Sequence, residues 1–363
     1  MNGKVAALNG PSSFEWQTYP IPNPAPGALV LKVRRANICG SDIHAFHGES
    51  PVLSRAVPGH EFVGEILSLG EGVTTDNAGV PVEIGDRVVP VYYLTCRRCK
   101  ACLRGDFNMC QNSLVEWAKP PSEAPHFRGG FATHYYVSPD QYFFKVPDSI
   151  SDDIVAGANC GLAQMIFAIN AVNIRAGQTV LIQGAGGVGL YALAVAKDRG
   201  ARVIVIEAVP DRIALAKSFG ADEIIDMAVY TAAEARVARA LELTENEGPD
   251  CVIELTGVSH AFGEALLLAR VGGTVVSVGN LNVGPRNEIS IAPGLVTRKN
   301  LTVRGILRYN PGVLHEALLF LERTSGTFPF HELASSEYLL ENLADALADS
   351  ESRTVARASV VMK

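Results

Sequence analysis

Residues 179–189 read Thr-Val-Leu-Ile-Gln-Gly-Ala-Gly-Gly-Val-Gly, and this stretch decides the fold class. Its first five residues are a short apolar run that predicts a buried strand. A glycine turn follows, and the residues from about 188 to 199 predict a helix with Gly200 just past its end. A strand, a glycine-rich turn and a helix in direct succession predict the start of a parallel β-α-β unit.

The glycine turn has the spacing G-x-G-x-x-G. Gly184 would allow the tight turn, Gly186 would let the backbone approach a pyrophosphate, and Gly189 would allow close packing of helix and strand. The N–H groups of Gly187 and Val188, at the helix N-terminus, would face the phosphates. The motif alone is a weak signal, but a strand before it and a helix after it are the required context. We therefore expect a bound dinucleotide.

An acidic residue bears on the choice of dinucleotide. Glu207 ends the next predicted strand, 18 residues after Gly189. A carboxylate there can accept hydrogen bonds from both ribose hydroxyls and would repel a 2′-phosphate, which favours NAD over NADP. Arg212 is close enough in sequence to offset part of that repulsion. The alternative is that Glu207 is a solvated acid after a strand.

The alternation of strand and helix continues beyond the glycine turn. Further apolar runs predict strands at residues 202–206, 223–226, 251–255, 274–279 and 301–307. Strands separated by helices of ten or more residues imply parallel β-α-β units. We expect an α/β chain with a doubly wound coenzyme domain at residues 161–300.

The first part of the chain has a different pattern. In residues 1–160, short apolar runs are interrupted by glycine and proline, which predicts a folded-up sheet or partial barrel. Residues 301–363 are too few for a third core, so we expect them to complete the first domain. The predicted domains are therefore 1–160 with 301–363, and 161–300.

Bulk properties exclude several classes of protein. The chain has 363 residues, 48% of them hydrophobic, and a net charge of −7 without a basic run, so a nucleic-acid partner is not expected. The N-terminus lacks the long apolar core of a signal peptide. The most apolar long stretch, 154–174, contains several asparagines and a glutamine, which favours a buried helix over a membrane span. We expect a cytoplasmic location.

Four cysteines follow one another as C-x2-C-x2-C-x7-C. They are Cys96, Cys99, Cys102 and Cys110. Four thiolates this close in sequence can form a closed tetrahedral shell around one structural zinc ion. Two disulfides are the alternative, which the spacing and the absence of an export signal disfavour.

Other metal-capable residues lie apart in sequence. Cys39 lies in Ile-Cys-Gly-Ser-Asp-Ile-His, His60 and Glu61 in Pro-Gly-His-Glu, and Cys160 in Asn-Cys-Gly. Two thiolates and one imidazole leave a fourth zinc position open. The spacing alone does not link them, because a lone cysteine or histidine is usually part of a core.

In combination and in this order, these motifs resemble the zinc-dependent alcohol dehydrogenases of the medium-chain dehydrogenase/reductase superfamily, over essentially the whole chain. The resemblance implies a Rossmann coenzyme domain with a β-rich GroES-like catalytic domain. It also implies two zinc ions per chain, one catalytic and one structural. The implied activity is hydride transfer between an alcohol and NAD, giving an aldehyde or ketone, in the cleft between the two domains.

The resemblance also implies roles for single residues. Cys39, His60 and Cys160 would hold the catalytic zinc, and this ligand set is the one known for alcohol dehydrogenases. Glu61 would lie beside the metal or act as an occasional fourth ligand. Asp42 would accept a hydrogen bond from the far nitrogen of His60 and fix its tautomer. Alternatively, Asp42 is a plain turn acid.

Residues around the metal receive roles from the same resemblance. Ser41 would meet the substrate hydroxyl, and His44 would be the outer end of a proton relay. Tyr92 would line the substrate pocket, and Arg357 would contact the coenzyme pyrophosphate. His44 could instead be a surface histidine, and Tyr92 a core aromatic. Some relatives carry a cationic residue directly after the first zinc cysteine, where it can contact the pyrophosphate. This chain has Gly40 there, so the coenzyme would be held less tightly.

Several questions stay open at this point. Residues 111–130, with Trp117 and His126, could form a pocket lid or an oligomer contact. A polyol or threonine dehydrogenase of the same superfamily is the first alternative, and a non-catalytic zinc-stabilised dinucleotide sensor is the second. A metal-free quinone reductase is disfavoured, since such relatives generally lack both zinc sets. The family implies a small-molecule alcohol or carbonyl substrate and a homodimer or homotetramer formed through the coenzyme domain.

Overall fold

The structure is a computed structural model of the chain. It describes all residues except 281–282, 284–286, 335, 353–354, 356 and 363. The chain divides into two compact units: an N-terminal unit of Met1–Ala163 and Arg308–Lys363, and a central unit of Gln164–Leu307. These boundaries lie a few residues from the expected ones, because a helical segment continues through residue 163 and a strand occupies residues 302–305.

A seven-stranded sheet forms the centre of the N-terminal unit, with strand order β14-β15-β3-β4-β5-β7 and β6 paired with β3. The strands are β3 (Leu29–Asn37), β4 (Glu61–Leu69), β5 (Arg87–Pro90), β6 (His134–Val137), β7 (Phe143–Lys145), β14 (Ser336–Leu339) and β15 (Ala358–Val361). β15 pairs antiparallel with β3, so residues from the end of the chain join a sheet made by its beginning. β1 (Asn2–Leu8) and β2 (Phe14–Pro20) form a separate antiparallel hairpin.

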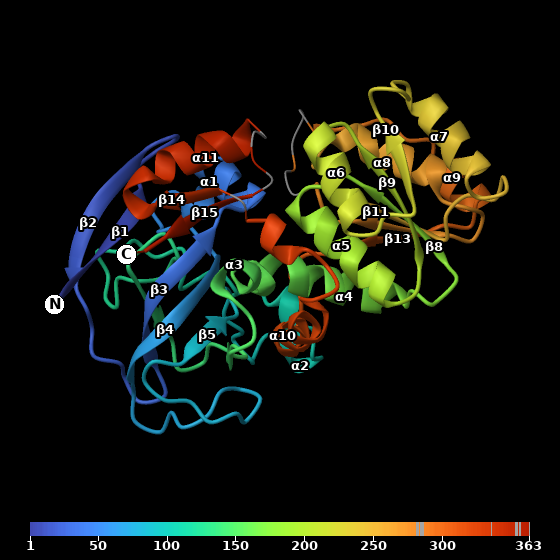
Figure 1. Cartoon of the computed structure of the whole chain (residues 1–363). Coiled ribbons are helices and arrows are strands. Elements are labelled where there is room, and N and C mark those ends of the chain that lie inside the picture. The colour runs from blue at the N-terminus through green and yellow to red at the C-terminus, as the bar shows by residue number, and fades with distance from the viewer. Residues whose placement is uncertain (281–282, 284–286, 335, 353–354, 356, 363) are drawn as a thin grey trace. The chain divides into compact units, whose positions relative to one another are not determined.

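The core of this unit lies where the sheet meets its helices. In β3, Leu31 and Val33 are fully buried while Lys32 between them is exposed, as expected for a strand with one buried face. Leu343, the first residue of α11 (Leu343–Glu351), packs in the same apolar cluster as Leu31. Figure 1 shows α11 lying along β14 and β15, which it contacts.

The remaining helices of the N-terminal unit are short, except α10. They are α1 (Gly40–Phe46), α2 (Lys100–Leu103), α3 (Asp152–Val155) and α10 (Gly312–Thr324), with single turns η1 (Pro51–Leu53), η2 (Phe107–Met109), η3 (Ala158–Leu162), η5 (Phe330–Glu332) and η6 (Leu340–Asn342). The helical stretch Asp152–Val172 is long and apolar enough to cross a membrane, but 72% of its most apolar window is buried inside the protein. It therefore has the burial of a core helix.

The central unit is built on a six-stranded parallel sheet of order β10-β9-β8-β11-β12-β13. The strands are β8 (Thr179–Gln183), β9 (Arg202–Glu207), β10 (Glu223–Asp226), β11 (Cys251–Glu254), β12 (Thr274–Ser277) and β13 (Thr302–Gly305). The helices are α4 (Ala163–Val172), α5 (Gly187–Asp198), α6 (Pro210–Ser218), α7 (Ala233–Glu242), α8 (Ser259–Leu268) and α9 (Pro293–Arg298). The predicted fold class, a doubly wound coenzyme domain with a β-rich second domain, is confirmed.

The sequence of the central strands explains their position. β8 and β9 are apolar except at their end residues, and nearly all their residues are buried, as in parallel strands covered by helices on both faces. β13 is different: it pairs with β12 at the end of the sheet, and all four of its residues are exposed. β13 is therefore an edge strand.

Candidate metal centre and coenzyme site

Four metal-capable side chains from distant parts of the sequence converge in the N-terminal unit. The ligand atoms of Cys39, His60, Glu61 and Cys160 all lie within 4.8 Å of one another. Cys39 directly precedes α1, His60 directly precedes β4, Glu61 begins β4, and Cys160 lies in η3. The structure thus brings together the three residues expected to share a zinc ion and the carboxylate expected beside them.

The turn before β4 places His60. Gly59 has φ +88°, a conformation that favours glycine, and a Cβ there would lie 2.6 Å from the backbone nitrogen of Phe131. No residue with a side chain fits this turn without a shift of the backbone. The Gly59 N–H donates to Asp42 Oδ1 at 3.1 Å, so the turn is attached to α1, the helix that follows Cys39.

Asp42 also fixes the ring of His60. His60 Nδ1 donates to the same Oδ1 at 3.2 Å, and Asp42 Oδ2 accepts the Cys39 N–H at 2.9 Å. A proton held on Nδ1 leaves the Nε2 lone pair available to a metal. Burial alone would lower the pKa of His60, but the charges and hydrogen bonds of Asp42 and Cys39 together outweigh burial and hold the pKa well above its ordinary value.

Cys160 lies in a π-helical turn, a rare geometry that often marks functional sites. The preceding residue, Asn159, is fully buried, and its side-chain nitrogen donates to the carbonyl oxygens of His60 at 2.8 Å and Pro90 at 3.0 Å. This amide therefore ties the turn that carries one candidate ligand to the backbone of another. No sequence motif indicated Asn159, because its partners are distant in sequence.

Glu61 is fully buried and forms an ion pair with Arg357, which is 5% exposed. Arg357, expected at the coenzyme pyrophosphate, thus lies against the candidate metal centre. Burial raises the pKa of the Glu61 carboxyl to about 8, against the opposing charge of Arg357. Among the described residues, Glu61 Oε1 has no hydrogen-bond partner. A buried carboxylate oxygen without a partner is unfavourable, and a cation would satisfy it.

The two sulfurs also fit a metal. A hydrogen bond from Cys160 holds the pKa of the Cys39 thiol well below its usual range, and the same contact raises the pKa of Cys160. The two sulfurs are therefore close enough to share a hydrogen bond. A divalent cation can replace the shared proton and bind both sulfurs with His60, so the donor set fits zinc.

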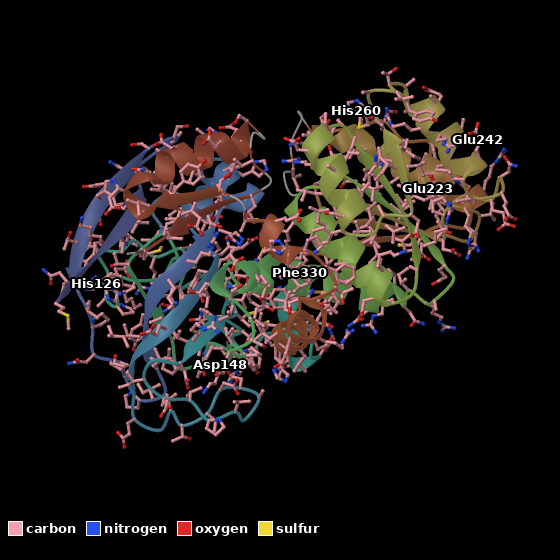
Figure 2. The ribbon with its side chains drawn as sticks, viewed as in Figure 1. His126, Asp148, Glu223, Glu242, His260 and Phe330 are labelled. Atoms are coloured by element: carbon pink, nitrogen blue, oxygen red, sulfur yellow. The ribbon has the colours of Figure 1, made fainter. Side chains whose placement is uncertain are left out.

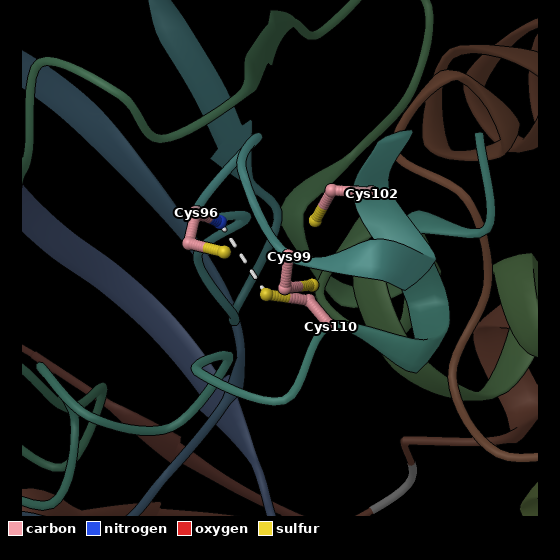
Figure 3. Close-up of side chains that lie close together, drawn as sticks. All are labelled: Cys96, Cys99, Cys102 and Cys110. Atoms are coloured by element: carbon pink, nitrogen blue, oxygen red, sulfur yellow. Dashed lines mark hydrogen bonds between the residues drawn. The ribbon is translucent and has the colours of Figure 1, made fainter. Parts of the chain in front are cut away.

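The four cysteines of the second cluster also converge. The sulfurs of Cys96, Cys99, Cys102 and Cys110 lie within 4.8 Å of one another, and none forms a disulfide (Figure 3). The Cys96 N–H donates to Cys110 Sγ at 3.3 Å. Hydrogen bonds from the Asn112 side chain and the Arg98 backbone lower the pKa of Cys96 to about 6. N–H donors directed at sulfur favour thiolates, as a closed zinc site requires.

Three residues were expected around the substrate, and the structure places two of them in α1 and the third beside His60. Ser41 and His44 are in α1, and His44 Nδ1 lies 2.6 Å from Glu49 Oε2. The His44 side chain is 43% exposed. The Tyr92 ring centroid lies 4.9 Å from that of His60. Tyr92 is therefore next to the candidate metal centre.

The segment 111–130 has two separate contacts. The Trp117 ring lies 5.6 Å from the His60 ring, and its indole N–H donates to the Val57 carbonyl at 2.8 Å. His126 stacks on Tyr19 of β2 with ring centroids 4.4 Å apart, and Figure 2 shows it beside the β1–β2 hairpin. Trp117 thus packs beside the candidate metal centre, where its position in sequence had left open whether the segment forms a pocket lid or an oligomer contact.

The glycine turn of the central unit has the expected sequence context. Gly184 follows β8 with φ +94°, and α5 begins at Gly187, followed by Val188. A Cβ on Gly189 would lie 2.0 Å from the carbonyl oxygen of Gly184, so this position tolerates glycine alone. Gly186 has more space, with the nearest atom in Arg212 at 3.8 Å. The turn therefore leads directly into the N-terminus of α5, where backbone N–H groups can contact a phosphate.

Glu207 connects the end of β9 to the glycine turn. Its Oε2 accepts the Ala185 N–H at 2.7 Å, and its Oε1 accepts the N–H groups of Ala208 at 2.7 Å and Val209 at 3.0 Å. The side chain is 6% exposed. These bonds hold the carboxylate beside the turn, where sequence reasoning placed the ribose of a dinucleotide. A solvated acid would not have three backbone donors.

Comparison with known proteins gives matches along most of the chain. Residues 25–148 match the alcohol dehydrogenase GroES-like domain, and residues 187–323 match the zinc-binding dehydrogenase family. The 5-exo-hydroxycamphor dehydrogenase of Pseudomonas putida is 32% identical over 95% of this chain and 94% of its own length. The sorbitol dehydrogenase of Halalkalibacterium halodurans is 31% identical over 93% of this chain and 94% of its own length.

A solved structure of an alcohol dehydrogenase has the same fold as this chain. An alcohol dehydrogenase from Thermotoga maritima superposes with a TM-score of 0.93 at 27% identity, covering 100% of both chains. The first match covers β3 to β7 of the β-rich sheet, and the second covers β9 to β13 of the parallel sheet. The chain therefore belongs to the zinc-dependent alcohol dehydrogenases of the medium-chain dehydrogenase/reductase superfamily and is an oxidoreductase.

Proposed function

We propose that this protein is an NAD-dependent dehydrogenase that transfers hydride between an alcohol and NAD, giving an aldehyde or ketone. The observation that carries the proposal is the convergence of Cys39, His60 and Cys160 within 4.8 Å. These three donors would hold zinc with one tetrahedral position open. Zinc in such a site would lower the pKa of a bound hydroxyl, as it lowers that of bound water to about 7.

The protein's own residues would orient the metal ligands and move the proton. Asp42 holds His60 with Nε2 free, as described above. Ser41 would accept the hydroxyl proton from the substrate and pass it toward His44. His44, in contact with Glu49 at 2.6 Å and 43% exposed, is suited to release the proton to solvent.

The central unit would bind the coenzyme. The N–H groups at the start of α5 would contact the pyrophosphate, and Glu207 would accept hydrogen bonds from the ribose hydroxyls. Three backbone donors keep Glu207 at the turn, so its charge would oppose a 2′-phosphate. This arrangement supports a preference for NAD over NADP.

The substrate would contact aromatic side chains beside the candidate metal centre. Tyr92 and Trp117 present rings 4.9 and 5.6 Å from the ring of His60. Such rings exclude water and favour an apolar group beside the reacting carbon. The P. putida relative acts on hydroxycamphor according to its name, which agrees with an apolar alcohol. The sorbitol dehydrogenase relative supports a polyol as the second candidate substrate class.

The four cysteines would hold a second, structural zinc, since they fill all four tetrahedral positions. The protein would assemble as a homodimer or homotetramer through its central unit. The exposed edge strand β13 supports this, because an edge strand has backbone groups ready to pair with another chain.

Metal analysis combined with His60→Ala tests the function. The wild type should contain two zinc ions per chain and reduce NAD with at least one alcohol in a panel of apolar alcohols, polyols and threonine. His60→Ala should lose one zinc and all hydride transfer, whereas His331→Ala, at a side chain 66% exposed, should change neither. Hydride transfer that survives in metal-free His60→Ala would contradict the proposal. One zinc per chain with no turnover would favour the non-catalytic sensor.

A further inference from the structure

A three-residue segment, Arg308–Asn310, is hydrogen-bonded to the loop that carries the four cysteines. The Asn310 side-chain oxygen accepts the Asn108 N–H at 3.2 Å, and the Arg308 guanidinium donates to the Asn108 carbonyl at 3.4 Å. Asn108 lies two residues before Cys110, the last of the four cysteines. The segment therefore contacts the cysteine loop through both of its end residues.

The middle residue of the segment contacts the other metal centre. The buried Tyr309 hydroxyl donates to the carbonyl of Asn159, which directly precedes Cys160. The Asn159 side chain in turn donates to the His60 carbonyl at 2.8 Å. A continuous path of hydrogen bonds thus leads from the cysteine loop through Tyr309 to the backbone of two candidate ligands.

The segment is itself held in place. The buried Tyr93 hydroxyl donates to the Tyr309 carbonyl, and the Arg308 guanidinium lies 5.6 Å from the centre of the Tyr93 ring. Arg308 has φ +60°, a left-handed conformation that is unfavourable for most residues with a side chain. Tyr93 lies three residues before Cys96, so the first cysteine is also close in sequence to this contact.

We propose that Arg308–Asn310 is a brace that couples the two metal centres, so that Tyr309 acts as a positioning residue for Cys160 and His60. This inference rests on the proposed metal role of Cys39, His60 and Cys160. A metal on the four cysteines orders their loop, the loop holds the segment through Asn108, and the segment holds the turn of Cys160. Contiguous hydrogen-bond networks of this kind can carry energetic coupling between two sites, and a measured effect at one site of a change at the other is the evidence for it.

The test uses two variants on opposite sides of the brace in the full-length protein. Tyr309→Phe removes only the hydroxyl that reaches Asn159, and Asn310→Ala removes the side-chain amide whose oxygen accepts the Asn108 N–H. Cobalt(II) in place of zinc lets the two-sulfur, one-nitrogen centre and the four-sulfur centre be followed separately by their absorption during release to a chelator. In each variant, losing one hydrogen bond of this path should speed cobalt release from the centre of Cys39, His60 and Cys160 by about 5-fold.

Tyr338→Phe is the matched control, since it also removes a tyrosine hydroxyl, one that donates to Asp349 at 2.5 Å. It should leave both release rates unchanged. Asn310→Asp, which keeps an acceptor oxygen, should restore wild-type release. The brace is disproved if Asn310→Ala speeds release only from the four-sulfur centre, or if Tyr309→Phe behaves like the control. A wild type that binds no cobalt at Cys39, His60 and Cys160 would instead refute the proposed function.

Discussion

Asp42 Oδ1 lies 3.2 Å from His60 Nδ1, and the two side chains are 2% and 4% exposed. The same oxygen accepts the N–H of Gly59, and the other oxygen accepts the N–H of Cys39. One buried carboxylate therefore positions the backbone before two candidate ligands and the ring of one of them. Through these three contacts Asp42 links the backbone of Cys39 to the backbone and ring of the turn that carries His60.

We expect Asp42→Asn to weaken zinc binding at this centre by about 10- to 100-fold, the usual cost of losing the partner of a ligating histidine. Zinc affinity measured by competition with a chelator checks this. Asp76→Asn is the control, because Asp76 also accepts backbone N–H groups, those of Ala78, Val80 and Lys145, but lies outside the centre. Equal zinc affinity in the two variants would contradict the role of Asp42.

Stability should depend on pH through Asp222. Burial alone would raise the pKa of this carboxyl, but hydrogen bonds from Lys197 and the Val203 N–H outweigh burial and hold the pKa below the usual 3.8. A pKa lowered by folding gives stability that is present above the unfolded pKa and is lost as pH falls through the folded pKa.

Asp222→Asn should therefore lower the free energy of unfolding by about 1 kcal/mol at neutral pH, because the contact is partly exposed to solvent. The difference from wild type should shrink as the pH falls below about 4. Denaturant unfolding at several pH values measures it. A difference of the same size at pH 3 and pH 7 would mean that charge is not the cause.

The features that the sequence predicted correctly are those encoded by local spacing. The glycine turn that begins at Gly184 and the parallel β-α-β order follow from strand and helix patterns within a short window. The cysteines of the second cluster lie within fifteen residues, so their convergence could be expected from spacing. The spacing of Cys39, His60 and Cys160 did not predict that they share a site, and only the resemblance to a family linked them.

Residues whose contacts depend on tertiary packing could not be predicted. Trp117 reaches His60 from a loop without periodicity, and Asn159 acts through carbonyls that are distant in sequence. Arg357 was expected at the coenzyme, which stays a prediction, and its buried ion pair with Glu61, nearly 300 residues away in sequence, was not foreseen. Such partners are set by strand pairing, since β15 places the end of the chain beside β3.

The coenzyme preference should depend on Glu207. Glu207→Gln removes the charge that would repel a 2′-phosphate, so kcat/KM with NADP relative to NAD should rise about tenfold, or about 1.4 kcal/mol. Initial rates with both coenzymes at fixed alcohol measure this ratio. Asp226→Asn is the control, because it removes a charge at the end of the neighbouring strand β10. An unchanged ratio in Glu207→Gln would show that this carboxylate does not select the coenzyme.

Assembly should depend on the edge strand β13. Val303 lies in this strand with 43% of its surface exposed, and neighbouring residues of the strand are also exposed. A lysine at such an edge opposes pairing with a second chain, since it would bury a charge between two backbones. We therefore expect Val303→Lys to shift the mass in solution, measured by analytical ultracentrifugation, toward the monomer. Val271→Lys, at a position 66% exposed outside the strand, should leave the mass unchanged. If Val303→Lys keeps the wild-type mass, the chains associate through another surface.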